Sequence, residues 1–250
     1  MLDINKANLK EIKFIISDVD DTITTNGKLH PVALEAMYKA VENGLKIILV
    51  TGGSAGWADV YIRQWPINYV ITESGALLLY KAEGGVQYKQ NPKIIESHIA
   101  KKKILEDKYL KYLSSDQYSR LYDVAVDLTK VNEVKLKEIE EDARSLGAYI
   151  AKSSIHMNIW FSPYDKKEAL LEFAPDLGLN EEIIQNNCIY IGDGLNDQVL
   201  FNYFKHSAGV KSVEENILKF SYLPKYCSQF HGGQGFNEIV SAVLSQQENK

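Results

Sequence analysis

Short apolar runs alternate with helical periods through the first third of the chain. Runs of apolar and β-branched residues predict strands at residues 14–19, 46–51 and 69–72. Between them, apolar residues recur every three to four positions over residues 31–43 and 54–65, which predicts two helices. Pro31 suits a first helical position, and Gly44 suits the left-handed residue that ends a helix. This alternation predicts a parallel sheet built from βαβ units.

The rhythm changes after residue 83. A charged helical stretch is predicted at residues 94–113, and a strand of alternating residues is predicted at 121–128. A helix at 132–146, which ends before Gly147, and an extended segment at 148–153 follow. The alternation of strands and helices then resumes, with strands predicted at residues 156–161 and 188–191. Helices are predicted at residues 166–177 and, last, at 236–244. We therefore expect an α/β protein with a doubly wound, Rossmann-like parallel sheet. Its core would be discontinuous, over residues 1–83 and 155–250, with an inserted α+β domain at residues 84–154.

Composition narrows the classes of function. The net charge of −5 argues against the broad phosphate neutralisation that nucleic-acid binding needs, and we interpret the basic run Lys101 to Lys103 as a solvated helix face. Cys188 and Cys227 lack the paired spacing of a disulfide framework or a zinc site. Apolar runs fall short of the ~20 residues of a membrane span, and residues 1–13 lack a secretory apolar stretch. We expect a soluble cytoplasmic protein without nucleic-acid or membrane partners, and its oligomeric state stays open.

Two acidic loops follow predicted strands, at the carboxyl ends where open α/β sheets bind ligands. Asp18 and Asp20 alternate along extended backbone, so that they suit one nucleophile and one proton-transfer group. Asp193 and Asp197 lie in a glycine-bearing loop and could hold a cation. Hard oxygen ligands select Mg²⁺, which commonly binds one or two carboxylates together with a substrate phosphate. Each loop alone could be an ordinary acidic turn, but two in equivalent places favour a site.

Two further features suit an anionic ligand. The segment Thr51-Gly52-Gly53-Ser54 joins a strand to a helix start, where free amides and the helix dipole favour phosphate. Lys166 begins another predicted helix, where the dipole disfavours lysine unless an anion compensates it. The histidines are far apart in sequence and lack ligand spacing, so we expect each to be structural or solvent-facing. A serine hydrolase is disfavoured, because the sequence has no Gly-x-Ser-x-Gly elbow.

Taken in order, these four pieces resemble the haloacid dehalogenase superfamily of phosphohydrolases, and within it the sugar phosphatases and archaeal-type phosphoglycolate phosphatases. The resemblance implies that Asp18 is the nucleophile that forms an aspartyl phosphate and that Asp20 is the general acid and base. It further implies phosphate-binding residues, namely Thr51, Gly52, Lys166 and Asn196. It implies a Mg²⁺ site formed by Asp193, Asp18 and the backbone carbonyl of Asp20, with Asp197 in support. The insert would be the cap that covers the site.

The chain departs from this branch in two substrate-side loops. Gly53 stands where members often carry Arg, and Ser74 stands within a motif that is usually Glu-Asn-Gly-Ala. These changes bear on the substrate more than on the reaction. In the insert, Arg120 is our candidate for gripping an anionic or hydroxyl-rich substrate body, since arginine offers a planar fork of donors. The competing interpretation is a surface arginine paired with a nearby acid.

Three functions remain open at this stage. The first is a magnesium-dependent phosphatase, a phosphoric monoester hydrolase that acts on a small phosphorylated metabolite such as a sugar phosphate or a phosphoglycolate-like compound. The second is a phosphomutase of the same superfamily, which would return the phosphoryl group to another hydroxyl. The third is a catalytically silent phosphate-binding module. The presence of Asp18, Asp20, Lys166 and Asp193 favours an active phosphatase.

Overall fold

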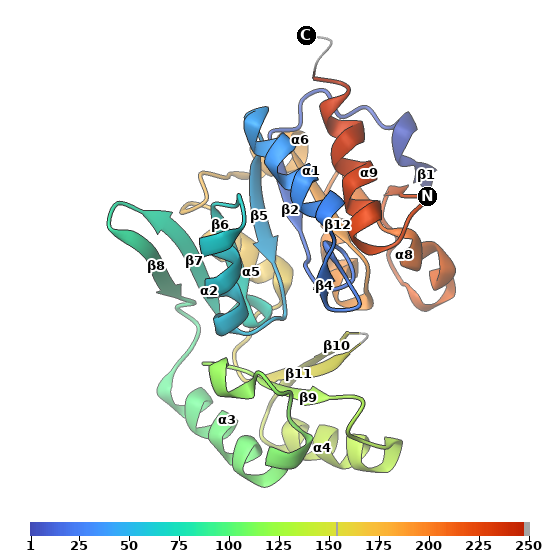
Figure 1. Ribbon diagram of the computed structural model, residues 1–250. Coiled ribbons are helices and arrows are strands. Elements are labelled where there is room, and N and C mark those ends of the chain that lie inside the picture. The colour runs from blue at the N-terminus through green and yellow to red at the C-terminus, as the bar shows by residue number, and fades with distance from the viewer. Residues whose placement is uncertain (154, 248–250) are drawn as a thin grey trace.

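A large, mostly parallel sheet forms the core of the computed structural model, which describes residues 1–153 and 155–247 (Figure 1). From edge to edge its strands are β1 (Leu2–Asp3), β14 (Tyr226–Cys227), β13 (Ser207–Gly209), β12 (Cys188–Gly192), β2 (Phe14–Ser17), β5 (Lys46–Val50), β6 (Tyr69–Thr72), β7 (Leu77–Ala82) and β8 (Gly85–Gln90). The pairs from β1 to β6 are parallel, whereas β7 is antiparallel to both β6 and β8. The predicted doubly wound α/β core is confirmed.

The order of the strands creates a switch point beside β2. From β2 the chain moves to β5 and β6 on one side, and much later it adds β12, β13 and β14 on the other. Crossovers that leave in opposite directions open a crevice at the carboxyl ends of the two central strands. Asp18 directly follows β2 and Asp193 directly follows β12, so both acidic loops border this crevice.

Helices cover both faces of the core sheet. One face packs against α1 (Pro31–Glu42), α2 (Ala55–Gln64) and α9 (Gly232–Leu244), and the other packs against α5 (Lys166–Phe173), α6 (Glu181–Asn187), α7 (Gln198–Tyr203) and α8 (Lys211–Glu215). Ile15 faces the first group while its neighbour Ile16 faces the second, because successive strand residues point to opposite sides. A central strand therefore needs apolar residues on both faces, which explains the apolar run Phe14 to Ile16 in β2.

A smaller unit, the cap, lies against the carboxyl edge of the core sheet (Figure 1). Its sheet has the order β10 (Tyr149–Lys152), β11 (His156–Trp160), β9 (Val124–Asp127), and α3 (Glu96–Tyr109) and α4 (Glu133–Ser145) cover the face away from the core. The remaining short elements are η1 (Ile4–Lys6), β3 (Thr24–Thr25), β4 (Lys28–Leu29), η2 (Glu73–Gly75), η3 (Leu110–Tyr112), η4 (Gln117–Ser119), η5 (Leu195–Asp197) and η6 (Ile217–Lys219).

The structure corrects the placement of two segments. The strand predicted at residues 156–161 does not return to the core, because β11 pairs antiparallel with β9 and β10. Its polar and apolar residues alternate, which suits a sheet with helices on one face only. At the other boundary, β8 belongs to the core sheet. We therefore propose that the cap begins after Gln90 and ends after Trp160; the predicted boundary residue Ser154 lies outside the described residues.

The basic run on α3 and the two cysteines differ in how they compare with the predictions. Lys102 is buried rather than solvated, since its side chain lies on the inner side of α3 and pairs with Glu106 at 2.6 Å, whereas Lys103 is exposed as predicted. Cys188 and Cys227 are both free thiols and both buried, in agreement with the prediction of no disulfide. Across residues 1–153 and 155–247, no helix has the length and apolar character needed to cross a membrane.

Candidate active site

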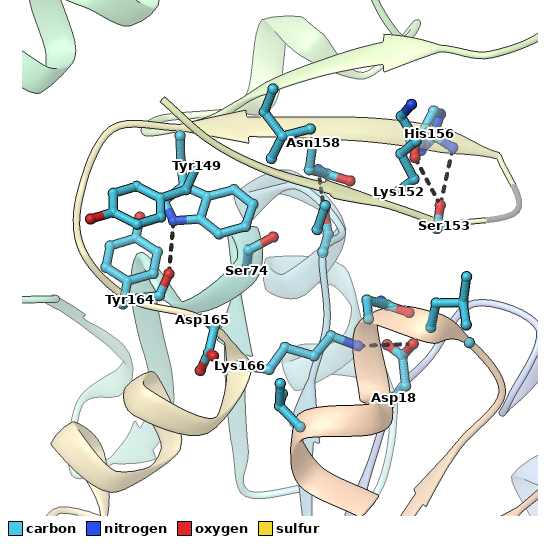
Figure 2. Close-up of a pocket in the computed structure, with 18 of the residues that line it drawn as sticks. Asp18, Ser74, Tyr149, Lys152, Ser153, His156, Asn158, Tyr164, Asp165 and Lys166 are labelled. Atoms are coloured by element: carbon cyan, nitrogen blue, oxygen red, sulfur yellow. Dashed lines mark hydrogen bonds and ion pairs between the residues drawn. The ribbon is translucent and has the colours of Figure 1, made fainter. Parts of the chain in front are cut away.

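A cavity of about 440 Å³ lies between the carboxyl edge of the core sheet and the cap. Its core side includes residues from the loops after β2, β5 and β12 and from the start of α5, namely Asp18, Asp20, Gly52, Lys166, Asp193 and Asn196. Figure 2 shows Asp18 and Lys166 on the core side and Tyr149, Asn158 and His156 on the cap strands opposite. The structure thus brings the residues of four separate sequence motifs to one place.

Asp18 is held rigidly at the base of the cavity. Its backbone N–H donates to the carbonyl of Ile191 at 2.9 Å, which continues the pairing of β2 with β12. Its side chain is buried, and Oδ2 lies 3.0 Å from Nζ of Lys166. Burial raises the pKa of Asp18 to about 7, and the neighbouring acids Asp197 and Asp20 add to this rise, although Lys166 opposes it. A cation beside Asp18 would favour its ionised form.

Lys166 links two acidic groups at the start of α5. Its ammonium lies 2.7 Å from Oδ1 of Asp197 in addition to its contact with Asp18, and the side chain is buried. Burial alone would lower the pKa of Lys166, but the two carboxylates raise it above its ordinary value. Lys166 therefore stays charged. The anionic compensation expected for a lysine at this helix end is supplied by these two residues.

The carboxylate of Asp197 is fully used by protein donors. Oδ1 accepts from Lys166 and from the hydroxyl of Tyr190 at 2.6 Å, and Oδ2 accepts from the backbone N–H groups of Asp193 and Gly194 at 3.0 Å each. A Cβ on Gly192 would lie 2.5 Å from Oδ2, so this close approach requires glycine. Because its acceptor positions are occupied, Asp197 holds the loop and Lys166 in place through these hydrogen bonds.

The acidic groups fit a hard divalent cation. Carboxylate oxygens of Asp18, Asp193 and Asp197 lie within 4.8 Å of one another. Burial, then Asp197 and Asp18, raise the pKa of Asp193 well above its ordinary value, because these charges crowd together with only Lys166 to offset them. Oxygen donors of this kind suit Mg²⁺. With Asp197 already engaged, Asp18 and Asp193 are the side chains that would hold it.

Asp20 and Asn196 complete the core side of the cavity, whereas Thr51 is buried directly before Gly52 and does not line the cavity. Asp20 lines the cavity, and burial raises its pKa, although positive charge on His156, Lys166 and Arg120 opposes this. A raised pKa keeps a carboxyl group protonated to higher pH, which suits a proton donor. The hydroxyl of Thr51 accepts the N–H of Gly53 at 2.9 Å, and Asn196 lines the cavity.

Arg120 does not occupy the predicted position. Its side chain is 1% exposed, and its guanidinium donates to Asp123 at 3.0 Å, to Asp116 at 3.3 Å and to the carbonyl of Gly52 at 2.9 Å. It is absent from the lining of the cavity that contains Asp18 and Lys166. The prediction that Arg120 grips the substrate is therefore wrong in this structure, because acidic residues of its own segment take its donors. The competing interpretation was right about the acids and wrong about the surface.

The cap side of the cavity consists of residues that sequence reasoning missed. Met157 and Ile159 of β11 pack toward α3 and α4, so the alternate residues His156, Asn158 and Trp160 face the core and line the cavity. The sequence suggested a structural or solvent-facing role for the histidines and did not place His156 at this cavity. The available signal was the alternation along β11, which marks one face as polar, but it becomes informative only when the pairing of the strand is known.

Comparisons with known proteins identify the fold and the family of the chain. In solved structures, the fold is similar to protein 0175 of Thermoplasma acidophilum (TM-score 0.75, 18% identity, 93% of this chain and 98% of that chain). It is also similar to BT1666 of Bacteroides thetaiotaomicron, a phosphatase of the haloalkanoate superfamily (TM-score 0.65, 14% identity, 95% of this chain and 96% of that chain). A third similar structure is the sucrose-phosphatase of Synechocystis sp. PCC6803 (TM-score 0.64, 15% identity, 94% of this chain and 98% of that chain). The family model of haloacid dehalogenase-like hydrolases matches residues 15–100 and 77–223. The chain therefore belongs to the family of haloacid dehalogenase-like hydrolases.

Proposed function

We propose that this hydrolase is a magnesium-dependent phosphatase that cleaves small phosphate monoesters through an aspartyl phosphate on Asp18. The observation that carries the proposal is the grouping of Asp18, Lys166 and Asp193 in one cavity, with Asp20 two residues beyond Asp18 on the same wall. Membership of a hydrolase family and the similarity to phosphatase folds support it.

In the first half of the reaction, a carboxylate oxygen of Asp18 forms a bond to phosphorus while the bond from phosphorus to the leaving alcohol oxygen breaks. Asp20 gives its proton to that oxygen, so that the alcohol departs neutral. Lys166 keeps its positive charge and faces the phosphoryl oxygens, where negative charge is concentrated. Thr51, Gly52 and Asn196 bind the same group.

In the second half, Asp20 accepts a proton from water, the water oxygen bonds to phosphorus, and the bond from phosphorus to Asp18 breaks. Inorganic phosphate leaves and both aspartates return to their starting forms. Mg²⁺ bound by Asp18 and Asp193 would neutralise charge on the phosphoryl group. The cap above the cavity limits entry of bulk water and of large substrates.

The cap wall favours a substrate with a neutral ring-shaped body over phosphoglycolate. Tyr149, Trp160 and Tyr164 form a continuous stack that lines one side of the cavity, with centroid separations of 6.2 and 6.1 Å. The carboxylate of phosphoglycolate, a second anionic group beside the phosphate, would need a cation, but Lys152 on the cap side already pairs with Glu140 at 2.6 Å. The aromatic wall instead offers apolar contact to a sugar ring or a planar ring.

The central experiment measures release of inorganic phosphate from a panel that contains 4-nitrophenyl phosphate, hexose phosphates and phosphoglycolate. We expect turnover with Mg²⁺ and none for Asp18→Asn, whose amide lacks the nucleophilic oxygen; Asp107→Asn, an exposed aspartate, is the matched control. Isomerised sugar phosphate without phosphate release would establish a mutase. A complete lack of turnover with retained phosphate binding would establish a silent module.

The substrate preference has its own test. Tyr149 is 45% exposed, so Tyr149→Ala should fold, and the equally exposed Tyr38→Ala on α1 controls for loss of a surface ring. We expect Tyr149→Ala to raise KM for the preferred ring-bearing substrate while leaving phosphoglycolate unaffected. Stronger cleavage of phosphoglycolate than of hexose phosphates by the unaltered enzyme would contradict this preference.

A further inference from the structure

A short cap segment, residues 116–123 (the docking segment), is bound directly to core loops beside the phosphate-binding residues. Glu73, in the core, is fully buried, and its carboxylate accepts the N–H groups of Ala55 in α2 and of Leu121, Tyr122 and Asp123 in the docking segment, at distances of 2.6 to 3.2 Å. Hydrogen bonds to a carboxylate are about twice as strong as neutral ones. One side chain thus joins the start of a core helix to the cap.

The backbone at this junction is strained. Glu73 has φ of 50° and Ser74 has φ of 58°, so two successive residues with side chains adopt the left-handed conformation. Each such residue costs on the order of 1–3 kcal/mol and persists only where the surroundings hold it. The N–H groups that donate to the Glu73 carboxylate stabilise this backbone conformation. Strain of this kind accumulates where a precise position is needed.

Arg120 and Asn158 meet at the carbonyl of Gly52. Arg120 donates to this oxygen at 2.9 Å and Asn158 donates to it at 3.1 Å, so both of its acceptor positions are filled from the cap. Asp123 orients both donors, because its carboxylate accepts from Arg120 at 3.0 Å and from Asn158 at 2.8 Å. These side chains are at most 6% exposed. We call Arg120, Asp123 and Asn158 the Gly52 clamp.

Fixing the Gly52 carbonyl also fixes the Thr51 hydroxyl. The carbonyl of Gly52 and the N–H of Gly53 belong to one planar peptide unit and point in opposite directions. With the carbonyl held by the clamp, the N–H is aimed at Oγ1 of Thr51, to which it donates at 2.9 Å. A hydroxyl that accepts there retains its own proton to donate elsewhere. The proton of Thr51 is then available to a phosphoryl oxygen.

We propose that the Gly52 clamp is a set of positioning residues through which the docked cap completes the phosphate-binding loop of the core. The clamp acts through Gly52 and Gly53 on Thr51. Asn158 also lines the cavity, but Arg120 and Asp123 do not, so these two act through the loop alone. The inference rests on the proposed function, since it assigns the loop to binding the transferred phosphoryl group. Its consequence is that the clamp matters equally for every substrate, because every substrate presents the same phosphoryl group.

Arg120→Lys is the sharpest test. Lysine keeps the charge that Asp123 and Asp116 need, but one ammonium cannot reproduce the fork that also reaches Gly52. We expect kcat to fall by about 10- to 100-fold, a range typical of small misplacements. The fall should be equal for 4-nitrophenyl phosphate and for a hexose phosphate. Arg63→Lys, which changes an exposed arginine paired with Asp59, is the matched control and should leave kcat unchanged.

Binding of inorganic phosphate, measured by calorimetry with Mg²⁺ present, separates the outcomes without requiring turnover. We expect Arg120→Lys to weaken it about tenfold. Should that variant not fold, Asn158→Leu removes the second donor to Gly52 while leaving the pairing of Arg120 with Asp123, and it should weaken phosphate binding as well. A folded variant with unaltered phosphate affinity overturns the clamp.

Two further results have distinct meanings. A loss of turnover by Arg120→Lys that is confined to the hexose phosphate would show that Arg120 contacts the substrate body, and would overturn the inference. An unaltered enzyme that binds phosphate but hydrolyses no monoester would reject the proposed function. In that case, weaker phosphate binding by the variants would still establish the clamp.

Discussion

At the scale of single residues, the site depends on side chains that never need to meet the substrate. Asp197 accepts from two side chains and two backbone N–H groups, and it thereby sets the position of Lys166 and of the loop that carries Asp193. A carboxylate is required at this position because only an acceptor on both oxygens can satisfy these donors. Its removal should affect stability and chemistry together.

We expect Asp197→Asn to lower the free energy of unfolding by about 3 kcal/mol, because it breaks a buried ion pair and turns one acceptor into a donor. Tyr190→Phe removes only one hydrogen bond to the same carboxylate and should cost about 1.5 kcal/mol. Urea unfolding monitored by circular dichroism measures both. Equal losses for the two variants would contradict the central role of Asp197.

Asp20 should affect chemistry but not the fold. Proton transfer by a positioned side chain typically contributes ~10²–10⁴-fold to the rate, so Asp20→Asn should lower kcat by a factor in this range. The loss should be smaller for 4-nitrophenyl phosphate than for a hexose phosphate, because the nitrophenolate leaves readily without a proton. Steady-state kinetics on both substrates gives the comparison. Unchanged rates on both would remove Asp20 from the mechanism.

At the scale of elements, the connection from α7 to β13 contains a histidine that is poorly accommodated when charged. In the part of the chain that the structure describes, Nδ1 of His206 is the buried side-chain atom without a hydrogen-bond partner. Burial, with Lys225 and Lys205 nearby, lowers the pKa of His206 to about 4. The unfolded chain binds this proton near pH 6.5, so it binds more protons than the folded chain between pH 6.5 and 4.

His206 should therefore contribute a loss of stability as pH falls through this window, while the buried acids Asp18 and Asp193, whose pKa values are raised, contribute in the opposite direction. We expect the His206 contribution to be about 1–2 kcal/mol between pH 7.5 and 4, less than the full shift implies because the side chain is only partly buried. His206→Gln should remove this part of the slope, and the exposed His231→Gln is the control. Urea titrations across the pH range test this. A slope unchanged by His206→Gln would place the proton elsewhere.

At the scale of the whole molecule, the proposed function implies that the carboxylates of Asp18 and Asp193 bind Mg²⁺ in the folded chain. Binding to the folded state alone stabilises it, by about 2.7 kcal/mol at a hundredfold excess over Kd. We expect Mg²⁺ to raise Tm, and Asp193→Asn to reduce that rise strongly, as measured by thermal unfolding. Ca²⁺ should support turnover poorly because it prefers looser, higher coordination. Equal Mg²⁺-dependent shifts in the two proteins would place the cation elsewhere.

The sequence by itself determined the core and its loops. Phe14 to Ser17 and Cys188 to Gly192 are buried on both faces and mostly apolar, which is typical of a central parallel strand, and each leads directly into an acidic loop. Because parallel strands end at one edge, Asp18 and Asp193 had to converge. Lys166 could be expected beside them, because a lysine at the start of a helix is unfavourable with the helix dipole unless an anion lies next to it.

Only the tertiary structure decided the cap. The pairing of β11 depends on β9 and β10, from distant parts of the chain, and it determines that His156, Asn158 and Trp160 face the site. The sequence allows Arg120 to be interpreted as a surface residue or a substrate ligand. The structure instead shows its guanidinium bound to Asp123 and to the carbonyl of Gly52. Strand pairing and buried ion pairs are long-range contacts, so local patterns identify the residues that take part without showing which partners they meet.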